Sequence, residues 1–93
     1  MFAWRNNTRT VWLDGRPVYF GYPGSADIIG LLPDGRFLAV ETKRPVGGKQ
    51  SPKQIRFQEK IEASGGVYLL VRSVEELECG IQRHLETGSG IAV

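Results

Sequence analysis

A β-hairpin with charged residues at its open end is predicted by the stretch DIIGLLPDGRFLAVETK, which runs from Asp27 to Lys43. Two mainly apolar runs, 27–32 and 37–43, are the candidate strands, because turn residues bound them. The connection between them reads Pro33-Asp34-Gly35. Proline suits the first central position of a type I turn, and glycine suits the left-handed position that follows in a three-residue loop. We therefore expect two antiparallel strands here.

The turn also predicts the register of the hairpin. A three-residue loop pairs Leu32 with Arg36, and counting back pairs Asp27 with Glu41. A tight two-residue turn would shift the register by one residue and place Asp27 on the other face. Because side chains alternate along a strand, Glu41 and Lys43 project from the same face. The expected result is a cluster of two carboxylates and one ammonium group.

This cluster has the composition of a metal-dependent hydrolytic site. Asp27 and Glu41 supply the hard oxygen ligands that Mg²⁺ and Mn²⁺ prefer, and the backbone carbonyl of Thr42 is a third candidate ligand. A water bound to such an ion can become the nucleophile. Lys43 can orient that water or stabilise charge developing on the phosphate, so the pattern favours phosphodiester hydrolysis. The competing interpretation is structural, with Asp27 capping a loop and Glu41 and Lys43 forming an ordinary surface pair.

The length and composition of the chain predict one domain, residues 1–93, with a small core. No apolar run approaches the roughly 18 residues of a membrane span, so we expect no membrane association. Cys79 is the one cysteine, which excludes an internal disulfide and favours a reducing, cytoplasmic location. With one cysteine and one histidine, a structural zinc site is not expected.

Positive charge is concentrated in the first part of the chain. Residues 1–56 carry nine Lys or Arg and four Asp or Glu, whereas residues 57–93 carry three and six. A basic half is typical of a protein with a polyanionic partner, although a solvated surface with chance asymmetry is the alternative. The basic residues expected to contact the phosphates of such a partner are Arg5, Arg44, Lys49, Lys53 and Arg56.

Further elements are predicted before and after the central hairpin. The apolar residues 11–13 and 18–20 are separated by a turn segment and predict a first hairpin. Ser51 is a candidate N-cap, with Pro52 at the first helical position and Gln54 closing a capping box. That helix is expected to end near Ser64, before two glycines.

The last part of the chain predicts a strand and a second helix. The continuous apolar run 67–71 is typical of a buried strand, and Ser73 with Glu76 forms a capping box for a helix reaching about Glu86. The order β-β-β-β-α-β-α predicts an α/β (α+β) fold, a small mixed sheet flanked by helices. The crossover from the Glu41 strand through the first helix to the Val67 strand should be parallel and right-handed.

These residues carry a family resemblance. Gly24-Ser25-Ala26-Asp27, the hairpin and Glu41-Thr42-Lys43 resemble the core of the PD-(D/E)XK nuclease superfamily, which has a restriction-endonuclease-like fold. The chain is most similar to the VRR-NUC family of replication and repair nucleases. The further matching segments are Arg5-Asn6-Asn7, Gln54-x-x-Phe57, Gly65-Gly66 and Leu70-Val71-Arg72-Ser73, the last a partial form of the Val-Arg-Arg motif. The proline that usually precedes the metal-binding aspartate is Ala26 here.

The resemblance implies metal-dependent cleavage of DNA. Asp27 and Glu41 would bind Mg²⁺ or Mn²⁺, Lys43 would act as base or charge stabiliser, and Gln54 would support the active site. Gln54 in the first helical turn also has the simpler role of capping. Family members often carry an acidic residue in an extra N-terminal helix, whereas the first acid here is Asp14, so the resemblance leaves one or two metal ions open.

The expected biological setting also comes from the resemblance. Compact family members imply a homodimer that cuts branched DNA such as four-way (Holliday) junctions during repair, in a bacterial or phage-infected cell. The segments expected to bury apolar surface between copies are the Trp4 segment, the Val11–Phe20 hairpin and the end Ile91-Ala92-Val93. A non-catalytic DNA-binding or assembly module with the same fold is the alternative, and a nuclease acting on RNA is a third possibility.

Overall fold

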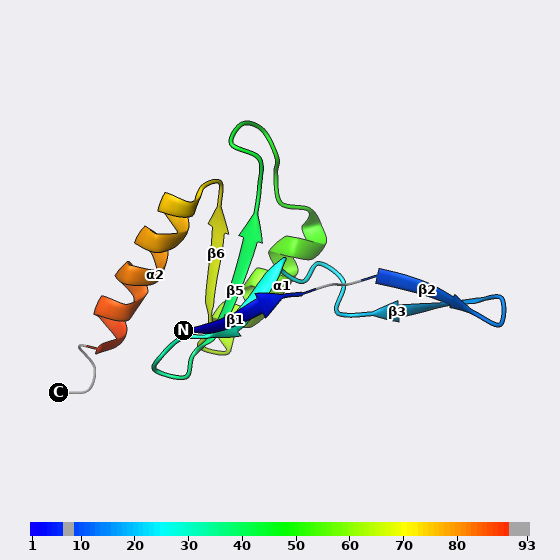
Figure 1. Cartoon of the computed structure of the whole chain (residues 1–93), viewed down its shortest axis with the longest axis horizontal. Coiled ribbons are helices and arrows are strands. Elements are labelled where there is room, and N and C mark those ends of the chain that lie inside the picture. Colours follow the sequence, from blue (N-terminus) through cyan, green and yellow to red (C-terminus); the bar gives the residue numbers. More distant parts are fainter. Residues whose placement is uncertain (7–8, 90–93) are drawn as a thin grey trace.

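The computed structural model describes residues 1–6 and 9–89, which fold into a small α+β domain. The elements are β1 (Phe2–Arg5), β2 (Arg9–Leu13), β3 (Arg16–Phe20), β4 (Ile28–Leu31), β5 (Phe37–Thr42), α1 (Pro52–Ala63), β6 (Val67–Val71) and α2 (Val74–Ser89). One sheet has the order β1-β4-β5-β6, and β2 and β3 pair only with each other (Figure 1). Asn7 and the end 91–93, both named above, lie outside the described residues.

The central hairpin β4–β5 has the predicted register. Ile28 lies opposite Val40 in the ladder, and the same register places Asp27 opposite Glu41. The loop has the expected left-handed glycine, since Gly35 has φ +91°. The predicted three-residue turn and the pairing that follows from it are therefore confirmed.

The sheet is mixed, as predicted, because β6 runs parallel to β5 while the other pairs are antiparallel. Alternation along β5 divides the core between the two faces of the sheet. Leu38 and Val40 pack with residues of α2, whereas Ala39 belongs to a cluster with Phe57 of α1. The two helices therefore cover opposite faces (Figure 1). Glu41, two residues beyond Ala39, lies on the α1 face.

The first strands differ from the prediction in two ways. β1 was not predicted, yet it occupies the sheet edge beside β4, with Ala3 opposite Gly30. Gly30 permits this approach, because a Cβ there would lie 2.4 Å from the Phe2 carbonyl oxygen. The hairpin β2–β3 was predicted to join the mixed sheet and instead forms a separate two-stranded sheet. It projects away from the rest of the domain (Figure 1).

The turn of this projecting hairpin is shorter than the predicted turn, which comprised the four residues 14–17. Leu13 pairs directly with Arg16, so only Asp14 and Gly15 form the turn. Both have left-handed backbone angles, φ 50° and 73°, which two-residue type I′ turns require. The aspartate–glycine pair was the signal for this turn, and it extends β3 toward the N-terminus by two residues.

The helices begin where predicted. Ser51 caps α1 with a complete capping box involving Gln54, and Pro52 is the first helical residue. Only half of the capping box that was predicted at the start of α2 is formed. The Glu76 amide donates to Ser73 Oγ at 3.1 Å, but the Glu76 carboxylate accepts from the Arg72 amide instead of that of Ser73. α2 also continues to Ser89, beyond the predicted end near Glu86.

Candidate active site

Glu41 and Lys43 reach the same side of β5 and face the start of α1. The Glu41 residue is 3% exposed, and the Lys43 Nζ lies 4.0 Å from Glu41 Oε1. The Lys43 amide donates to the Val71 carbonyl at 2.9 Å, which extends the β5–β6 pairing beyond Thr42. The backbone of Lys43 is therefore held in the sheet while its side chain reaches toward α1. The predicted pairing of these two side chains on one face is confirmed.

Asp27 is held by Thr42 at the open end of the hairpin. The Thr42 amide and hydroxyl donate to Asp27 Oδ2 at 2.9 and 2.8 Å. Burial opposes ionisation of Asp27, but these hydrogen bonds, together with one from the Glu41 carboxyl and the charge of the Lys43 ammonium, outweigh it and keep the pKa of Asp27 below the usual value. Asp27 is thus a carboxylate at neutral pH. The role of the Thr42 hydroxyl was missed by the sequence analysis, which assigned only the carbonyl of this residue.

Glu41 has the opposite electrostatic environment. Burial, then repulsion by the Asp27 charge and a hydrogen bond from the protonated Glu41 carboxyl to Asp27, raise the pKa of Glu41 to about 7, and the nearby Lys43 ammonium only partly compensates. Glu41 Oε2 is buried and accepts no hydrogen bond in the part of the chain that the structure describes. A buried polar oxygen without a partner destabilises the fold, and such atoms are rare in proteins. The position therefore favours a proton or a cation on Glu41.

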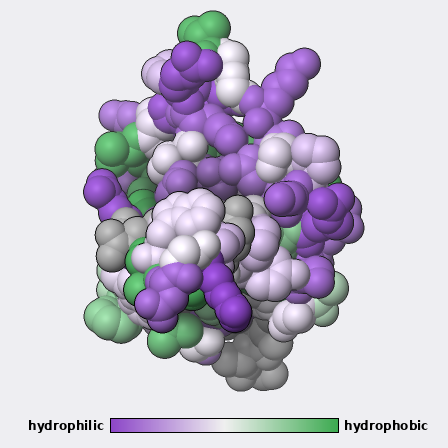
Figure 2. All heavy atoms as spheres, turned by 90° about the vertical axis from the view of Figure 1, so that its right-hand side faces the viewer, coloured by the Kyte–Doolittle hydropathy of each residue, from purple (hydrophilic) through white to green (hydrophobic). Residues whose placement is uncertain are grey.

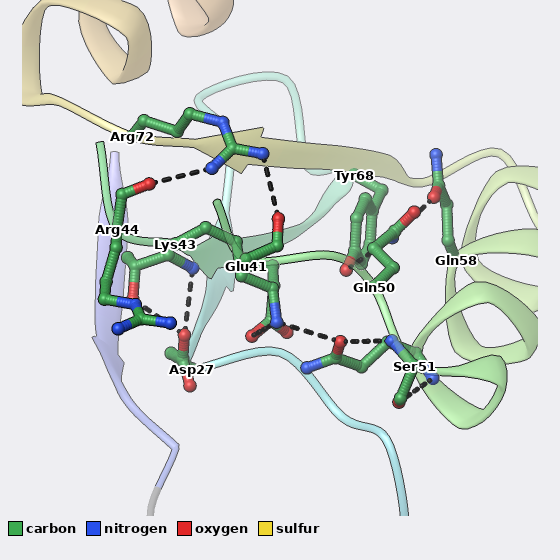
Figure 3. A network of polar contacts seen from close by, with 12 residues as sticks. Asp27, Glu41, Lys43, Arg44, Gln50, Ser51, Gln58, Tyr68 and Arg72 are labelled. Atoms are coloured by element: carbon green, nitrogen blue, oxygen red, sulfur yellow. Dashed lines mark hydrogen bonds and ion pairs between the residues drawn. The ribbon is translucent and has the colours of Figure 1, made fainter. Parts of the chain in front are cut away.

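Lys43 is also joined to the first turn of α1. Its Nζ donates to Gln54 Oε1 at 3.1 Å, and the Ser51 amide donates to the same oxygen at 2.9 Å (Figure 3). The Gln54 amide in turn donates to Ser51 Oγ at 3.2 Å. The capping and active-site interpretations of Gln54 are therefore compatible, because one oxygen serves the helix cap and positions the ammonium.

The loop that carries Asp27 is fixed by Asn6. The Asn6 amide donates to the Asp27 carbonyl at 2.7 Å, and its Nδ2 donates to Ser25 Oγ at 2.6 Å and to the Ala26 carbonyl at 3.1 Å. The sequence analysis placed Asn6 only within a family motif, and the structure gives it a positioning role. The two contacts of the Asn6 side chain, with consecutive residues Ser25 and Ala26, give a reason for an asparagine directly after β1.

Arg72 organises the loop between β5 and α1. Its guanidinium donates to the Arg44 carbonyl at 2.8 Å (Figure 3). It also donates to the carbonyls of Gly47 at 2.5 Å and Gly48 at 3.1 Å. Five donors in a fixed planar array suit arginine to such a role. The sequence analysis assigned Arg72 no function. No local pattern in the sequence indicates this role, because the contacts join Arg72 to residues 24 to 28 positions away.

The fit of a divalent cation was tested against the donor atoms present. In residues 1–6 and 9–89, no three Asp, Glu, His or Cys side chains are grouped closely enough to hold a metal ion. The candidate ligands are therefore the carboxylates of Asp27 and Glu41. Glu41 Oε2 has no hydrogen-bond partner in the described residues, and both burial and the Asp27 charge disfavour an unneutralised charge on Glu41. Mg²⁺ is commonly held by one or two carboxylates together with waters and substrate phosphates. The donors fit that mode, and the Thr42 carbonyl stays a predicted ligand.

The predicted DNA-contacting residues lie in three places. Arg44 and Lys49 are exposed in the loop before α1, and Lys53 and Arg56 are exposed on α1 beside Tyr22. Arg5 lies apart from them, on β1 at a cavity whose walls include Val40 and Leu77, residues of the α2 face. The side toward which the β2–β3 hairpin projects is mainly hydrophilic (Figure 2), which fits a polar partner.

Comparison of the chain with protein-family models, with curated proteins and with solved structures gave no match. Among the described residues, no helix is both long and apolar enough to cross a membrane.

Proposed function

We propose that this protein is a Mg²⁺- or Mn²⁺-dependent nuclease that hydrolyses phosphodiester bonds in DNA. One observation carries the proposal: Glu41 is buried next to the ionised Asp27, its Oε2 has no hydrogen-bond partner in the described residues, and the Lys43 ammonium lies 4.0 Å from its Oε1. Two carboxylates that repel each other, with an ammonium nearby, are typical of sites that bind a cation and a negatively charged substrate.

Each residue has a distinct role in the proposed reaction. Asp27 and Glu41 would hold the ion, which when bound would activate a water as the nucleophile and polarise the scissile phosphate. Thr42 keeps Asp27 ionised and oriented through two hydrogen bonds. Lys43 stabilises the negative charge that develops on the phosphate oxygens, and Gln54 holds its ammonium in place.

The family resemblance gives the proposal its substrate. The Asp27, Glu41 and Lys43 pattern and the Asn6 and Arg72 contacts support a VRR-NUC-like domain with a PD-(D/E)XK core. We infer branched DNA, including four-way junctions, as the substrate and repair or recombination as the process, in the cytoplasm of a bacterial or phage-infected cell. A homodimer would place two active sites on the two strands that junction resolution must cut.

The decisive experiment is a cleavage assay with the purified protein and Mn²⁺ or Mg²⁺. Linear duplex, flapped and four-way DNA serve as substrates, a single-stranded RNA tests the choice of nucleic acid, and Glu41→Gln protein is the negative control. Cleavage of branched DNA by the wild type alone supports the proposal. No cleavage of any substrate with either ion contradicts it.

A non-catalytic DNA-binding module is the second candidate, favoured by the first acid of the sequence being Asp14, whereas family members often carry an acidic residue before the Arg-Asn segment. The same assay separates the two functions, since such a module would bind branched DNA without cutting it. Light scattering at micromolar concentration tests the dimer. A monomer that cuts flaps but never gives paired nicks in a junction would contradict dimeric resolution.

A further inference from the structure

A shallow pocket of about 340 Å³ lies on α1 next to the proposed active site, lined by Tyr22, Pro23, Lys53, Arg56 and Lys60. It combines an aromatic ring with three cations, and no carboxylate among the described residues lines it. We propose that this pocket binds one unpaired nucleotide of the DNA strand entering the active site, its base stacked on Tyr22 and the adjoining phosphates on the cations. The inference rests on the proposed function and adds a preference for unpaired DNA.

Tyr22 is a supported and accessible ring. It is 50% exposed, and its centroid lies 5.9 Å from that of the buried Phe57, which in turn contacts Tyr68 at 6.3 Å. The Lys60 Nζ lies over the Tyr22 ring, 5.6 Å from the centroid. A cation in this position is attracted by the electron-rich face of the ring, and a lysine side chain is flexible enough to move away from that face. A nucleobase can take that place while the ammonium moves to a phosphate, and base–aromatic stacking is tolerant of sequence.

The three cations on α1 repel one another, and this repulsion destabilises the helix. Lys53, Arg56 and Lys60 are three and four residues apart, so like charges are neighbours on one face. Lys53 lies in the first turn, which contains no acidic residue, although the helix dipole favours acids there. None of the three forms an ion pair with a carboxylate in the described part of the chain. The three positive charges are therefore available to bind a polyanion.

The pocket is rigidly connected to the proposed active site. Gly24, two residues after Tyr22, packs so closely on α1 that a Cβ there would lie 2.4 Å from the Lys53 carbonyl oxygen. Lys53 is followed by Gln54, whose side chain holds Lys43. The same loop continues to Asp27. A DNA strand whose scissile phosphate lay at Asp27 and Glu41 would therefore place a neighbouring nucleotide in the pocket.

The test compares binding of two DNAs by fluorescence anisotropy, with Ca²⁺ in place of Mg²⁺ or Mn²⁺ to avoid cleavage. One is a labelled duplex, and the other is the same duplex with a single-stranded flap. Tyr22→Ala should weaken flap binding roughly 5- to 140-fold, the range for one stacked base, with less than about a twofold change for the duplex. Tyr22→Phe should bind both like the wild type. Trp12→Ala, which removes a 68% exposed ring from the separate hairpin, is the matched control and should leave the ratio of flap affinity to duplex affinity unchanged.

A second variant tests the cations independently of the ring. Arg56→Gln should reduce the slope of log affinity against log salt for the flapped DNA by about 0.7, the value for one single-strand phosphate. Arg16→Gln on the separate hairpin should leave that slope unchanged. The inference would be overturned if Tyr22→Ala weakened binding of duplex and flap equally, or left flap binding unchanged. It would also be overturned if the control variants had the same effects as Tyr22→Ala and Arg56→Gln. Absence of cleavage in Mn²⁺ would contradict the nuclease proposal alone, because the binding data do not depend on turnover.

Discussion

The Lys43 ammonium and the Gln54 side chain are joined by a 3.1 Å hydrogen bond at the oxygen that also closes the capping box of α1. The end of β5 and the beginning of α1 therefore share one acceptor. A helix cap forms whether or not the protein is an enzyme, so the cap fixes Gln54 before any substrate arrives. This arrangement pre-organises Lys43, and its effect on activity can be separated from its effect on stability.

Gln54→Ala should reduce cleavage more than Ser51→Ala at a similar loss of stability. Each substitution removes one half of the capping box, which stabilises the fold by about 0.5–2 kcal/mol. Only Gln54→Ala also removes the acceptor of Lys43. Urea unfolding measures stability, and steady-state cleavage measures activity. Equal losses of cleavage in the two variants would show that Gln54 is only a cap.

Lys43→Ala should slow cleavage by roughly two to three orders of magnitude, the usual effect of removing one charge stabiliser from a transition state. Binding of Mn²⁺, followed by calorimetry, should persist because both carboxylates remain. The Lys43 Nζ is 4.0 Å from Glu41 Oε1, which makes the pair a weak ion pair rather than a tight one. Unchanged turnover would assign Lys43 a structural role.

Glu41→Gln should abolish cleavage and leave the fold intact or slightly more stable at pH 8 without metal. The amide keeps the size of the side chain and removes the charge that burial and Asp27 oppose. Activity with Mg²⁺ and thermal unfolding with EDTA are the measurements. Glu59→Gln, an exposed change of the same kind on α1, is the control and should affect neither. Cleavage at the wild-type rate by the Glu41→Gln variant would show that the proposed site is wrong.

The sequence was sufficient to predict the hairpin that carries the site. Pro33 and Gly35 defined the turn, the turn defined the register, and the register placed Asp27 opposite Glu41. The capping residues of α1 were equally informative, because their signals are local. Family-level expectations and the substrate stay predictions.

The elements that the sequence did not predict depend on contacts between distant segments. β1 is short and gains its hydrogen bonds from β4, which the Gly30 position makes possible. Nothing local in the Val11–Phe20 hairpin indicates that it stands outside the sheet. Likewise, the contacts of Asn6 with residues 25–27 and of Arg72 with residues 44–48 exist only after the chain has folded.

The metal-free protein should become less stable as pH rises from about 4.5 to about 7. Native Glu41, with its pKa raised to about 7, keeps a proton that the unfolded chain loses near the ordinary value of 4.5. The stabilisation is therefore complete below the unfolded pKa and lost as pH passes the native one, with a total of about 3 kcal/mol. Asp27, with a lowered pKa, acts in the opposite sense and at lower pH. Urea unfolding with EDTA should show the slope in the wild type and not in Glu41→Gln, and parallel curves would contradict the assignment.

Gly24→Ala should destabilise the protein more than Gly35→Ala and should also reduce cleavage. Both glycines have left-handed angles, φ +80° and +91°, so an alanine strains the backbone by about 1–2 kcal/mol at either position. A Cβ at Gly35 meets nothing within 4 Å, whereas a Cβ at Gly24 would lie 2.4 Å from the backbone oxygen of Lys53. Because that contact is with backbone, the loop or α1 must move, which adds about 1–3 kcal/mol. The loop leads to Asp27, so the carboxylate would shift relative to Glu41. Urea unfolding of the two variants gives the stability difference, and cleavage per folded molecule gives the effect on the site; equal stability losses would show that the close packing of Gly24 on α1 is not formed in solution.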